Sequence, residues 1–286
     1  MWIPFAEDPE AAASRPDRAG THQVMTFTTL RVARRPRDFV AVSGPDAGSY
    51  LQAMVSNDVE GLGPGEACEA LFLTAKARVI APMTVLRRAA DDFLLLTESG
   101  LGERLRVGLT RMRFAAKCEI ATEEHVSVVI LGDGEGIPTA DYGTPAIEVL
   151  DADLEPTVGD DELELLRIRA GTPRFGREID DRVLPAEAGL DTRAVNFEKG
   201  CYPGQEPIAR QHYRGRINRS LRVLAVEGEE LPEYDAELAY EGKTVGRVTS
   251  AARDGDRAVA LAYVRVAVPR DAALDLEGRS ATQLDA

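Results

Sequence analysis

The chain has 286 residues, of which 44% are hydrophobic and 29% are charged, and its formal net charge is −14. This composition is typical of a folded protein with ample core, and the length predicts two or three domains in one compact body. The negative charge argues against nonspecific binding to nucleic acid or to anionic membranes, and an apolar run of about 20 residues, as a membrane span needs, is missing.

Residues 1–23 are predicted to form a flexible leader. The stretch is rich in proline and acidic residues, and it lacks the basic start and apolar middle of a secretory signal, so we expect the protein in the cytoplasm. The three cysteines, Cys68, Cys118 and Cys201, are far apart and odd in number. This usage fits a reducing compartment and gives no disulfide framework.

Residues 24–125 are predicted to form an α+β region with mostly antiparallel strands. Ala47, Tyr50, Leu51 and Met54 recur at helical spacing, whereas other stretches show short apolar runs bounded by turns. The pattern predicts helices at 46–55 and 100–112, and strands at 24–32, 38–44, 68–73, 79–87, 92–97 and 114–120. The sequence T-A-K-A-R is expected to form the turn between the third and fourth of these strands.

Residues 126–216 are predicted to form a second α+β region, interleaved with the first. It begins with a strand at 126–131. Eight acidic residues and no basic residue lie between Ile147 and Glu164, which is typical of a solvated loop and the start of a helix. The helix is expected from residue 160 to 169, because acidic residues begin it and arginines end it. A long irregular segment, 174–198, follows, and such segments in compact proteins are usually functional.

Residues 217–286 are predicted to form a small all-β module, with a boundary near Arg216. Short alternating runs at 221–227, 236–240, 244–250 and 258–266 are separated by turns such as E-G-K and D-G-D. This pattern is typical of a barrel or a sandwich. The predicted fold class is therefore α+β, with mixed antiparallel sheets and helices followed by the β module.

The most unusual stretch reads K-G-C-Y-P-G-Q-E-P-I-A-R, from Lys199 to Arg210, and it contains Cys201 between two glycines. A cysteine reacts or binds metal as the thiolate, which nearby cations and backbone amides stabilise. Glycines allow a loop to wrap a ligand or to present the sulfur. From these residues alone, the alternative is an inert buried cysteine. His212 could approach the thiol, but a surface histidine is the simpler interpretation, and a cysteine hydrolase is a weak hypothesis.

Basic residues are concentrated around this stretch in an otherwise acidic chain. They form either a solvated face or a docking site for an anion, such as a polyglutamate tail, a phosphate backbone or an acidic partner. The cluster consists of Arg193, Lys199, Arg210, Arg214, Arg216, Arg219 and Arg222, against Glu198 and Glu206.

The sequence resembles a known family at these residues. K-G-C-Y-x-G-Q-E followed by x-x-A-R is similar to the signature of the YgfZ proteins, which are relatives of the T protein of the glycine cleavage system. The stretches R-A-G-T-P-R-F-G-R-E, L-P-A-E-A-G-L-D, Y-L-Q-A-M-V-S-N-D-V and G-K-T-V-G-R-V-T-S also resemble that family. The resemblance runs from about residue 25 to residue 280.

The resemblance implies a tetrahydrofolate-binding fold of three domains around a central channel, ending in a β-barrel. It implies a role in iron–sulfur cluster assembly or repair, and through it in tRNA modification. Folate or a derivative would be the cofactor, with a transient iron–sulfur cluster as a second candidate. Iron–sulfur assembly or client proteins would be the partners of a monomer, without DNA or a membrane.

The resemblance also implies roles for single residues. Cys201 would be the functional thiol and a candidate iron–sulfur ligand. The remaining motif residues would form the cofactor-binding set, namely Lys199, Gly200, Tyr202, Gly204, Gln205, Glu206 and Arg210.

The sequence departs from the family pattern in two places. The T protein has an acidic pair where this chain has Ala81 and Pro82, and Asp91 and Asp92 are expected in the following turn instead. A folate-dependent aminomethyltransferase is therefore the alternative function, and a non-enzymatic accessory role is favoured. Ala77 replaces a glycine that YgfZ proteins often have in the preceding turn. A third hypothesis is a module that docks RNA or protein through the basic surface from Arg210 to Arg222.

Overall fold

The computed structural model describes residues 30–215 and 217–284. The predicted leader at 1–23, the start of the first predicted strand and the predicted boundary at Arg216 lie outside these residues, and the division of the chain into three regions stays a prediction. No helix in the described ranges is long and apolar enough to cross a membrane.

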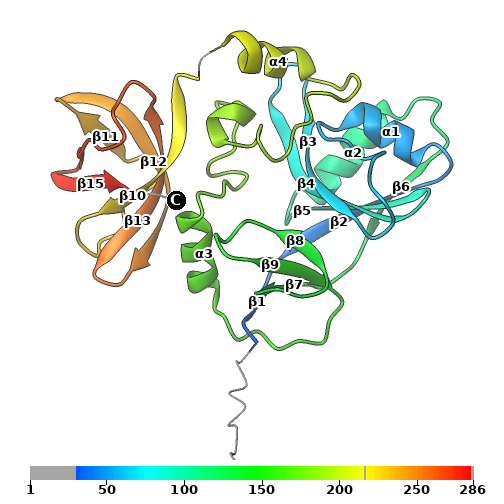
Figure 1. The fold of residues 1–286 in the computed structure, drawn as a ribbon, viewed down its shortest axis with the longest axis horizontal. Coiled ribbons are helices and arrows are strands. Elements are labelled where there is room, and N and C mark those ends of the chain that lie inside the picture. Colours follow the sequence, from blue (N-terminus) through cyan, green and yellow to red (C-terminus); the bar gives the residue numbers. More distant parts are fainter. Residues whose placement is uncertain (1–29, 216, 285–286) are drawn as a thin grey trace, which may run out of the picture.

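A five-stranded antiparallel sheet with strand order β3-β4-β5-β2-β6 forms one end of the molecule (Figure 1). Successive side chains of a strand point to opposite faces, so Val40 and Val42 pack in the core with α1 and α2, while Phe39 and Ala41 pack on the other face. Its elements are β2 (Arg37–Ser43), α1 (Ala47–Met54), β3 (Ala67–Leu73), β4 (Val79–Ala89), β5 (Asp92–Glu98), α2 (Gly102–Met112) and β6 (Glu119–Glu123).

Both predicted helices of this layer and the strands predicted at 38–44, 68–73, 79–87 and 92–97 are confirmed. The strand predicted at 114–120 is wrong in its first half. Phe114 has a φ of +45°, outside the strand region, and the strand begins only at Glu119.

A four-stranded sheet with order β1-β7-β9-β8 forms the second layer. Its strands are β1 (Val32–Arg34), β7 (Ser127–Leu131), β8 (Ile137–Thr139) and β9 (Ala146–Leu150). The solvated loop expected from residue 147 is therefore wrong at its start, because these residues form β9. Glu148 is only 1% exposed there, and it accepts two hydrogen bonds of 3.0 Å from Arg37. A buried carboxylate is tolerated when it is paired in this way.

Helix α3 (Asp160–Arg169) lies between this sheet and the C-terminal module, and it confirms the predicted helix. Leu163 and Leu166 pack beside Val129 in the core of the four-stranded sheet. Ile168 packs against Val223 on the other side. The helix therefore joins two layers, which explains why its apolar residues do not share one face.

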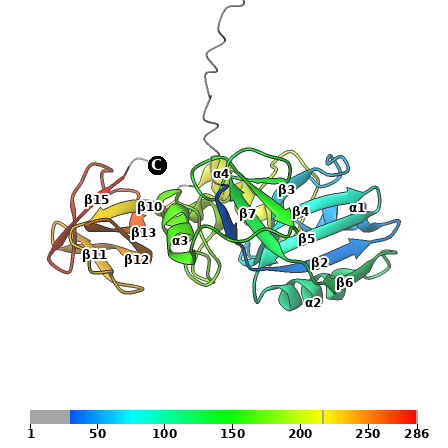
Figure 2. The ribbon, with the colours of Figure 1, turned by 90° about the horizontal axis from the view of Figure 1, so that it is seen from below.

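Strands β10 to β15 form a closed barrel with order β10-β13-β12-β11-β14-β15, which decides between the predicted barrel and sandwich. Figure 2 shows the barrel at one end, the five-stranded sheet at the other and α3 between them. Four strands match the predicted runs, but the short β14 and β15 were not predicted. The strands are β10 (Arg219–Val226), β11 (Glu237–Tyr240), β12 (Lys243–Asp254), β13 (Arg257–Arg265), β14 (Leu274–Leu276) and β15 (Arg279–Gln283).

The segment predicted to be irregular, 174–198, contains one short 3₁₀ helix, η1 (Pro185–Ala188). Its apolar side chains, among them Ile179, Val183 and Leu190, pack with Leu71 and Leu73 of β3. The segment is thus irregular but fixed against the end of the five-stranded sheet.

Candidate functional site

The cysteine loop, residues 196–204, is held in a compact turn at its start. The side-chain oxygen of Asn196 accepts hydrogen bonds from the backbone amides of Glu198 and Lys199, at 2.8 and 3.1 Å. Such a side-chain-to-backbone turn is a common use of asparagine in loops. The backbone amide of Asn196 in turn donates to the carbonyl oxygen of Ser56, which fixes the loop beside the N-terminal layer.

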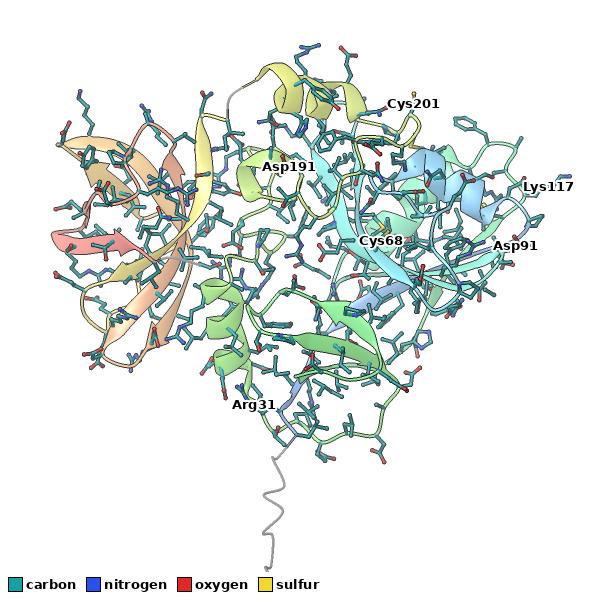
Figure 3. The ribbon with its side chains drawn as sticks, viewed as in Figure 1. Arg31, Cys68, Asp91, Lys117, Asp191 and Cys201 are labelled. Carbon is teal, nitrogen blue, oxygen red and sulfur yellow. The ribbon has the colours of Figure 1, made fainter. Side chains whose placement is uncertain are left out.

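Cys201 is exposed, and Figure 3 shows it at the outer edge of the molecule, far from Cys68. The other two thiols are shielded. Cys68 contacts the carbonyl oxygen of Asp58 at 3.7 Å, and burial raises its pKa to about 12. Cys118 is buried, which raises its pKa as well. The solvent-exposed thiol is therefore that of Cys201, and its functional role stays a prediction.

Lys199 ties the cysteine loop to the end of α1. Its Nζ donates hydrogen bonds of 2.7 Å to the carbonyl oxygens of Gln52, Val55 and Asn57. Carbonyls at a helix C-terminus lack helical partners, and a cation satisfies them and the helix dipole together. Burial lowers the pKa of Lys199 to about 8, but only the ammonium form can donate to all three carbonyls. The charged form of Lys199 is therefore the one that fastens the cysteine loop to the end of α1.

Gly204 docks the other end of the loop onto the turn between β3 and β4. Its φ is +85°, and a Cβ added there would lie 2.6 Å from the carbonyl oxygen of Thr74 and 3.1 Å from Cα of Ala77. Such distances exclude any side chain. Ala77 itself has a φ of +57° and is fully buried. This conformation explains why glycine suits position 77, and an alanine there carries strain of about 1–2 kcal/mol.

Helix α4 (Gln205–Arg214) follows Gly204 and was not predicted from the sequence. Pro207 in its first turn and the left-handed Gly204 before it are start signals that could have indicated it. The helix buries Ile208 beside Tyr202 in the core that also contains Leu73. The motif therefore has two faces, because Tyr202 and Gly204 are buried whereas Cys201 is exposed.

The outward side of α4 carries the polar motif residues. Arg210 and Glu206 form a 2.8 Å ion pair, with side chains 70% and 83% exposed, and such a pair contributes little to stability. His212 stacks on Phe197, with ring centroids 3.9 Å apart. The histidine is thus placed by an aromatic neighbour on the loop.

The described members of the basic cluster contact different partners, and the docking role of the cluster stays a prediction. Arg193 pairs with Glu69 and with Asp141, and Arg219 pairs with Glu187 at 3.1 Å. Arg193 and Arg219 thus pair with acidic residues in different parts of the fold. Spacing along the chain could not show this, because the partners lie far away in sequence.

A cavity of about 620 Å³ lies between the two sheets, α3 and the irregular segment. No residue from Lys199 to Arg210 is among the described residues that line it. No motif in the sequence marks this cavity, because its lining comes from separate strands and loops. Its polar and aromatic lining includes Arg34, Arg35, Arg37, Glu69, Thr84, Glu98, Asp141, Tyr142, Glu164, Arg167, Arg174 and Arg193, and its apolar lining includes Leu71, Met83, Leu163, Ile179 and Leu190.

Most charges of the cavity wall are paired. Burial acts to raise the pKa of Asp141, but Arg35 and Arg193 outweigh it and hold that pKa well below the ordinary value. Glu98 differs, because there burial outweighs the hydrogen bond from Phe175 and the charges of the nearby arginines and so raises the pKa. It accepts a 2.9 Å hydrogen bond from the backbone amide of Phe175. Glu98 is therefore a carboxyl group that can meet a ligand in this cavity.

The stretch that would carry the acidic pair of the T protein also lies at this cavity. Ala81 is fully buried in the core beneath the helices, and Pro82 lines the cavity. Asp92 begins β5 after the turn and pairs with Arg88 at 2.7 Å. Neither Asp91 nor Asp92 lines the cavity. Positions 81 and 82 therefore place no carboxylate on the cavity wall.

The described residues do not form a ligand set for a resident metal centre. No group of three or more histidine, cysteine, aspartate or glutamate side chains is arranged there to hold a metal ion. Cys201 could contribute one thiolate, whereas iron–sulfur clusters are generally held by about four protein ligands.

No protein-family model matches the chain. Among curated proteins, the tRNA-modifying protein YgfZ of Edwardsiella ictaluri is 27% identical, over 86% of this chain and 87% of its own length. A mitochondrial iron–sulfur cluster assembly factor IBA57 homolog of Pyricularia oryzae is 27% identical over 91% and 76%. An aminomethyltransferase of Rippkaea orientalis is 26% identical over 78% and 75%.

A solved structure supports the fold. The glycine cleavage system aminomethyltransferase T from Bartonella henselae superposes with a TM-score of 0.73, covering 90% of this chain and 85% of that one, at 21% identity. At this identity the likeness concerns the arrangement of elements, and it agrees with the α+β layers and C-terminal barrel described above.

Proposed function

We propose that the chain binds tetrahydrofolate or a derivative in the central cavity, because it is similar to a YgfZ protein and to an IBA57 homolog over most of its length. In this role it supports iron–sulfur cluster assembly or repair, and so tRNA modification. Cys201 is the functional thiol of that role.

The observation that carries the folate proposal is the cavity itself. Its volume of about 620 Å³ lies within the range of about 300–1,000 Å³ typical of small-molecule sites. Apolar side chains such as Leu71 and Met83 can cover the faces of a flat ring. Glu98 can accept an N–H group of the pterin, and Arg34 can pair with a carboxylate of the glutamate tail. The residues present therefore fit a folate.

The test is a calorimetric titration of tetrahydrofolate into the wild-type protein and single variants. We expect saturable binding, weakened at least tenfold by Glu98→Gln and unchanged by Glu119→Gln, which removes an exposed carboxylate from β6. Arg210→Gln tests the predicted contact of the motif with folate, which stays a prediction. Equal affinity in the wild type and Glu98→Gln would refute the assigned cavity.

The thiol proposal rests on the exposure of Cys201 and on the contacts that shape its loop. An iron–sulfur cluster would be cargo here, with Cys201 as one ligand and a client or assembly protein supplying the others. Lys199 and Gly204 would act by fixing the loop that presents the sulfur.

The thiol role is tested in cells that lack the protein. Wild-type protein should restore tRNA methylthiolation by an iron–sulfur enzyme, and Cys201→Ser should not. Glu198→Gln, an exposed substitution in the same loop, is the matched control and should restore it. Full restoration by Cys201→Ser would exclude the thiol role, and it would leave the folate proposal to its own titration.

The alternative is a folate-dependent aminomethyltransferase, and the similarity to the Rippkaea orientalis enzyme favours it. Ala81 and Pro82 disfavour it, since they leave the wall without the carboxylate that helps the transfer in the T protein. The measurement is the formation of methylene-tetrahydrofolate from an aminomethyl donor. We expect none above background.

A further inference from the structure

A second cavity, of about 240 Å³, lies where the end of α3 meets the barrel strands β10 and β15. Leu221, Val223 and Leu284 form its apolar part, and its polar groups come from Arg222, Arg270 and Gln283. No aspartate or glutamate is among the described residues that line it. In a chain of net charge −14 this lining is unusual.

Arg222 is the buried base of this cavity and only 6% exposed. Its guanidinium donates to the carbonyl oxygens of Val268, Arg265 and Pro269, at 2.8, 3.3 and 3.4 Å. These bonds hold the group rigidly. Of the two N–H groups left over, one on Nη1 and one at Nε, the Nε atom is buried and has no partner among the described residues. A buried donor without a partner is costly, so its retention calls for an acceptor.

Two further groups meet Arg222 at the cavity. Oε1 of Gln283 is buried and also lacks a partner in the described ranges. Because an amide can be turned to present its NH₂ instead, Gln283 can act as a donor. Arg270 is exposed and lines the same cavity. Burial lowers the pKa of Arg222, and the charge of Arg270 lowers it further.

The helix end beside the cavity does not supply the acceptor. The amides of Ala170, Gly171 and Thr172 donate to carbonyl oxygens of the last turn of α3, at 3.0 to 3.1 Å. These carbonyls are therefore already satisfied. What the cavity offers is three donor groups, two of them cationic, around an apolar wall.

We propose that this cavity is a binding site for a small oxyanion, a phosphate or a carboxylate, held by Arg222, Arg270 and Gln283. The exposed Arg270 can present two parallel N–H donors that match the oxygen atoms of either anion, and Arg222 adds its unpartnered N–H at Nε. The site is separate from the central cavity and does not depend on folate binding. It also gives a role to a member of the basic cluster that pairs with no carboxylate among the described residues.

The test follows the Nε–Hε signal of Arg222 by ¹⁵N NMR of the full chain during titration with inorganic phosphate. Potassium chloride at equal ionic strength controls for screening, and glutarate provides the carboxylate arm. We expect a saturable shift with at least one oxyanion. The anion that binds more tightly shows whether the site prefers a phosphate or a carboxylate. Thermal unfolding should move to higher temperature with the same anion, because a ligand of the native state stabilises it.

Variants make the assignment specific. Arg270→Gln and Gln283→Leu, away from the buried carbonyl contacts, should each weaken the oxyanion at least tenfold. Arg253→Gln removes an equal charge from a site 63% exposed on the barrel, and it should leave the affinity unchanged. The proposal is overturned if neither phosphate nor glutarate shifts the Arg222 signal. It is also overturned if Arg270→Gln binds the oxyanion as tightly as the wild type does.

Discussion

Gly204→Ala should destabilise the protein strongly, because a methyl group has no room where the cysteine loop meets the β3–β4 turn. The added Cβ would lie 2.6 Å from the carbonyl oxygen of Thr74, 3.1 Å from Cα of Ala77 and 3.2 Å from Cβ of Leu73. Two of these atoms belong to the backbone and cannot turn aside as a side-chain end can. The loop must therefore lift from the turn.

Two effects set the size of this loss. An L-residue at a φ of +85° costs about 1–2 kcal/mol, and overpacking adds about 1–3 kcal/mol. The free energy of unfolding should fall by roughly 2–5 kcal/mol. Gly176, with a φ of +80° and no atom within 4 Å of an added Cβ, isolates the first effect. Gly200, in the same motif, also has no atom within 4 Å and no positive φ.

Urea unfolding of the three alanine variants measures these effects. We expect a loss below about 0.5 kcal/mol for Gly200→Ala, about 1–2 kcal/mol for Gly176→Ala and a clearly larger loss for Gly204→Ala. Hydrogen exchange should show added opening of the cysteine loop in Gly204→Ala alone. A loss in Gly204→Ala no greater than in Gly176→Ala would refute the close contact with the turn.

Three further results are expected. Lys199→Met should lower the free energy of unfolding, measured in urea, by roughly 2–4 kcal/mol, because three carbonyl oxygens lose a charged donor. Restored stability in Lys199→Arg would contradict the geometry in which one nitrogen atom donates to all three carbonyls. Alkylation of the folded protein at neutral pH should modify Cys201 alone, with Cys68 and Cys118 reacting only in urea; rapid reaction of either one in the fold would contradict their burial. Hydrogen bonds to Asp151 and Glu123 raise the pKa of His125, so its stabilisation is complete below about pH 6.5 and is lost as the pH rises through the raised value. His125→Gln should flatten that dependence in urea midpoints measured across this range, and an unchanged slope would refute the assignment.

The periodicity of apolar residues is sufficient to predict the longer helices and strands, because their apolar residues face one core. The helix at 160–169 was found from its charged ends, although its apolar residues serve two layers. The short strands β14 and β15 are not predicted, since three to five residues are too few to show a hydrophobic periodicity. Glu148 was misread as solvated, because its partners Arg35 and Arg37 lie more than 100 residues away.

The cysteine motif was recognisable because its residues are contiguous, but the direction of each side chain was not. Lys199 belongs to the predicted cofactor-binding set, whereas its ammonium group donates to carbonyl oxygens at the end of α1. The central cavity could not be located at all. Glu98 and Asp141 come from different layers, and only the folded chain brings them to one wall.

The anchoring of the cysteine loop has a consequence for folding. Lys199 reaches carbonyls that precede it by 142 to 147 positions, and Asn196 reaches Ser56. Contacts across such long stretches close large loops of chain, and they form late in folding compared with local turns. A chain whose N-terminal layer is incomplete has nothing on which to shape the loop. The cysteine loop therefore takes its final shape only after the N-terminal layer has formed.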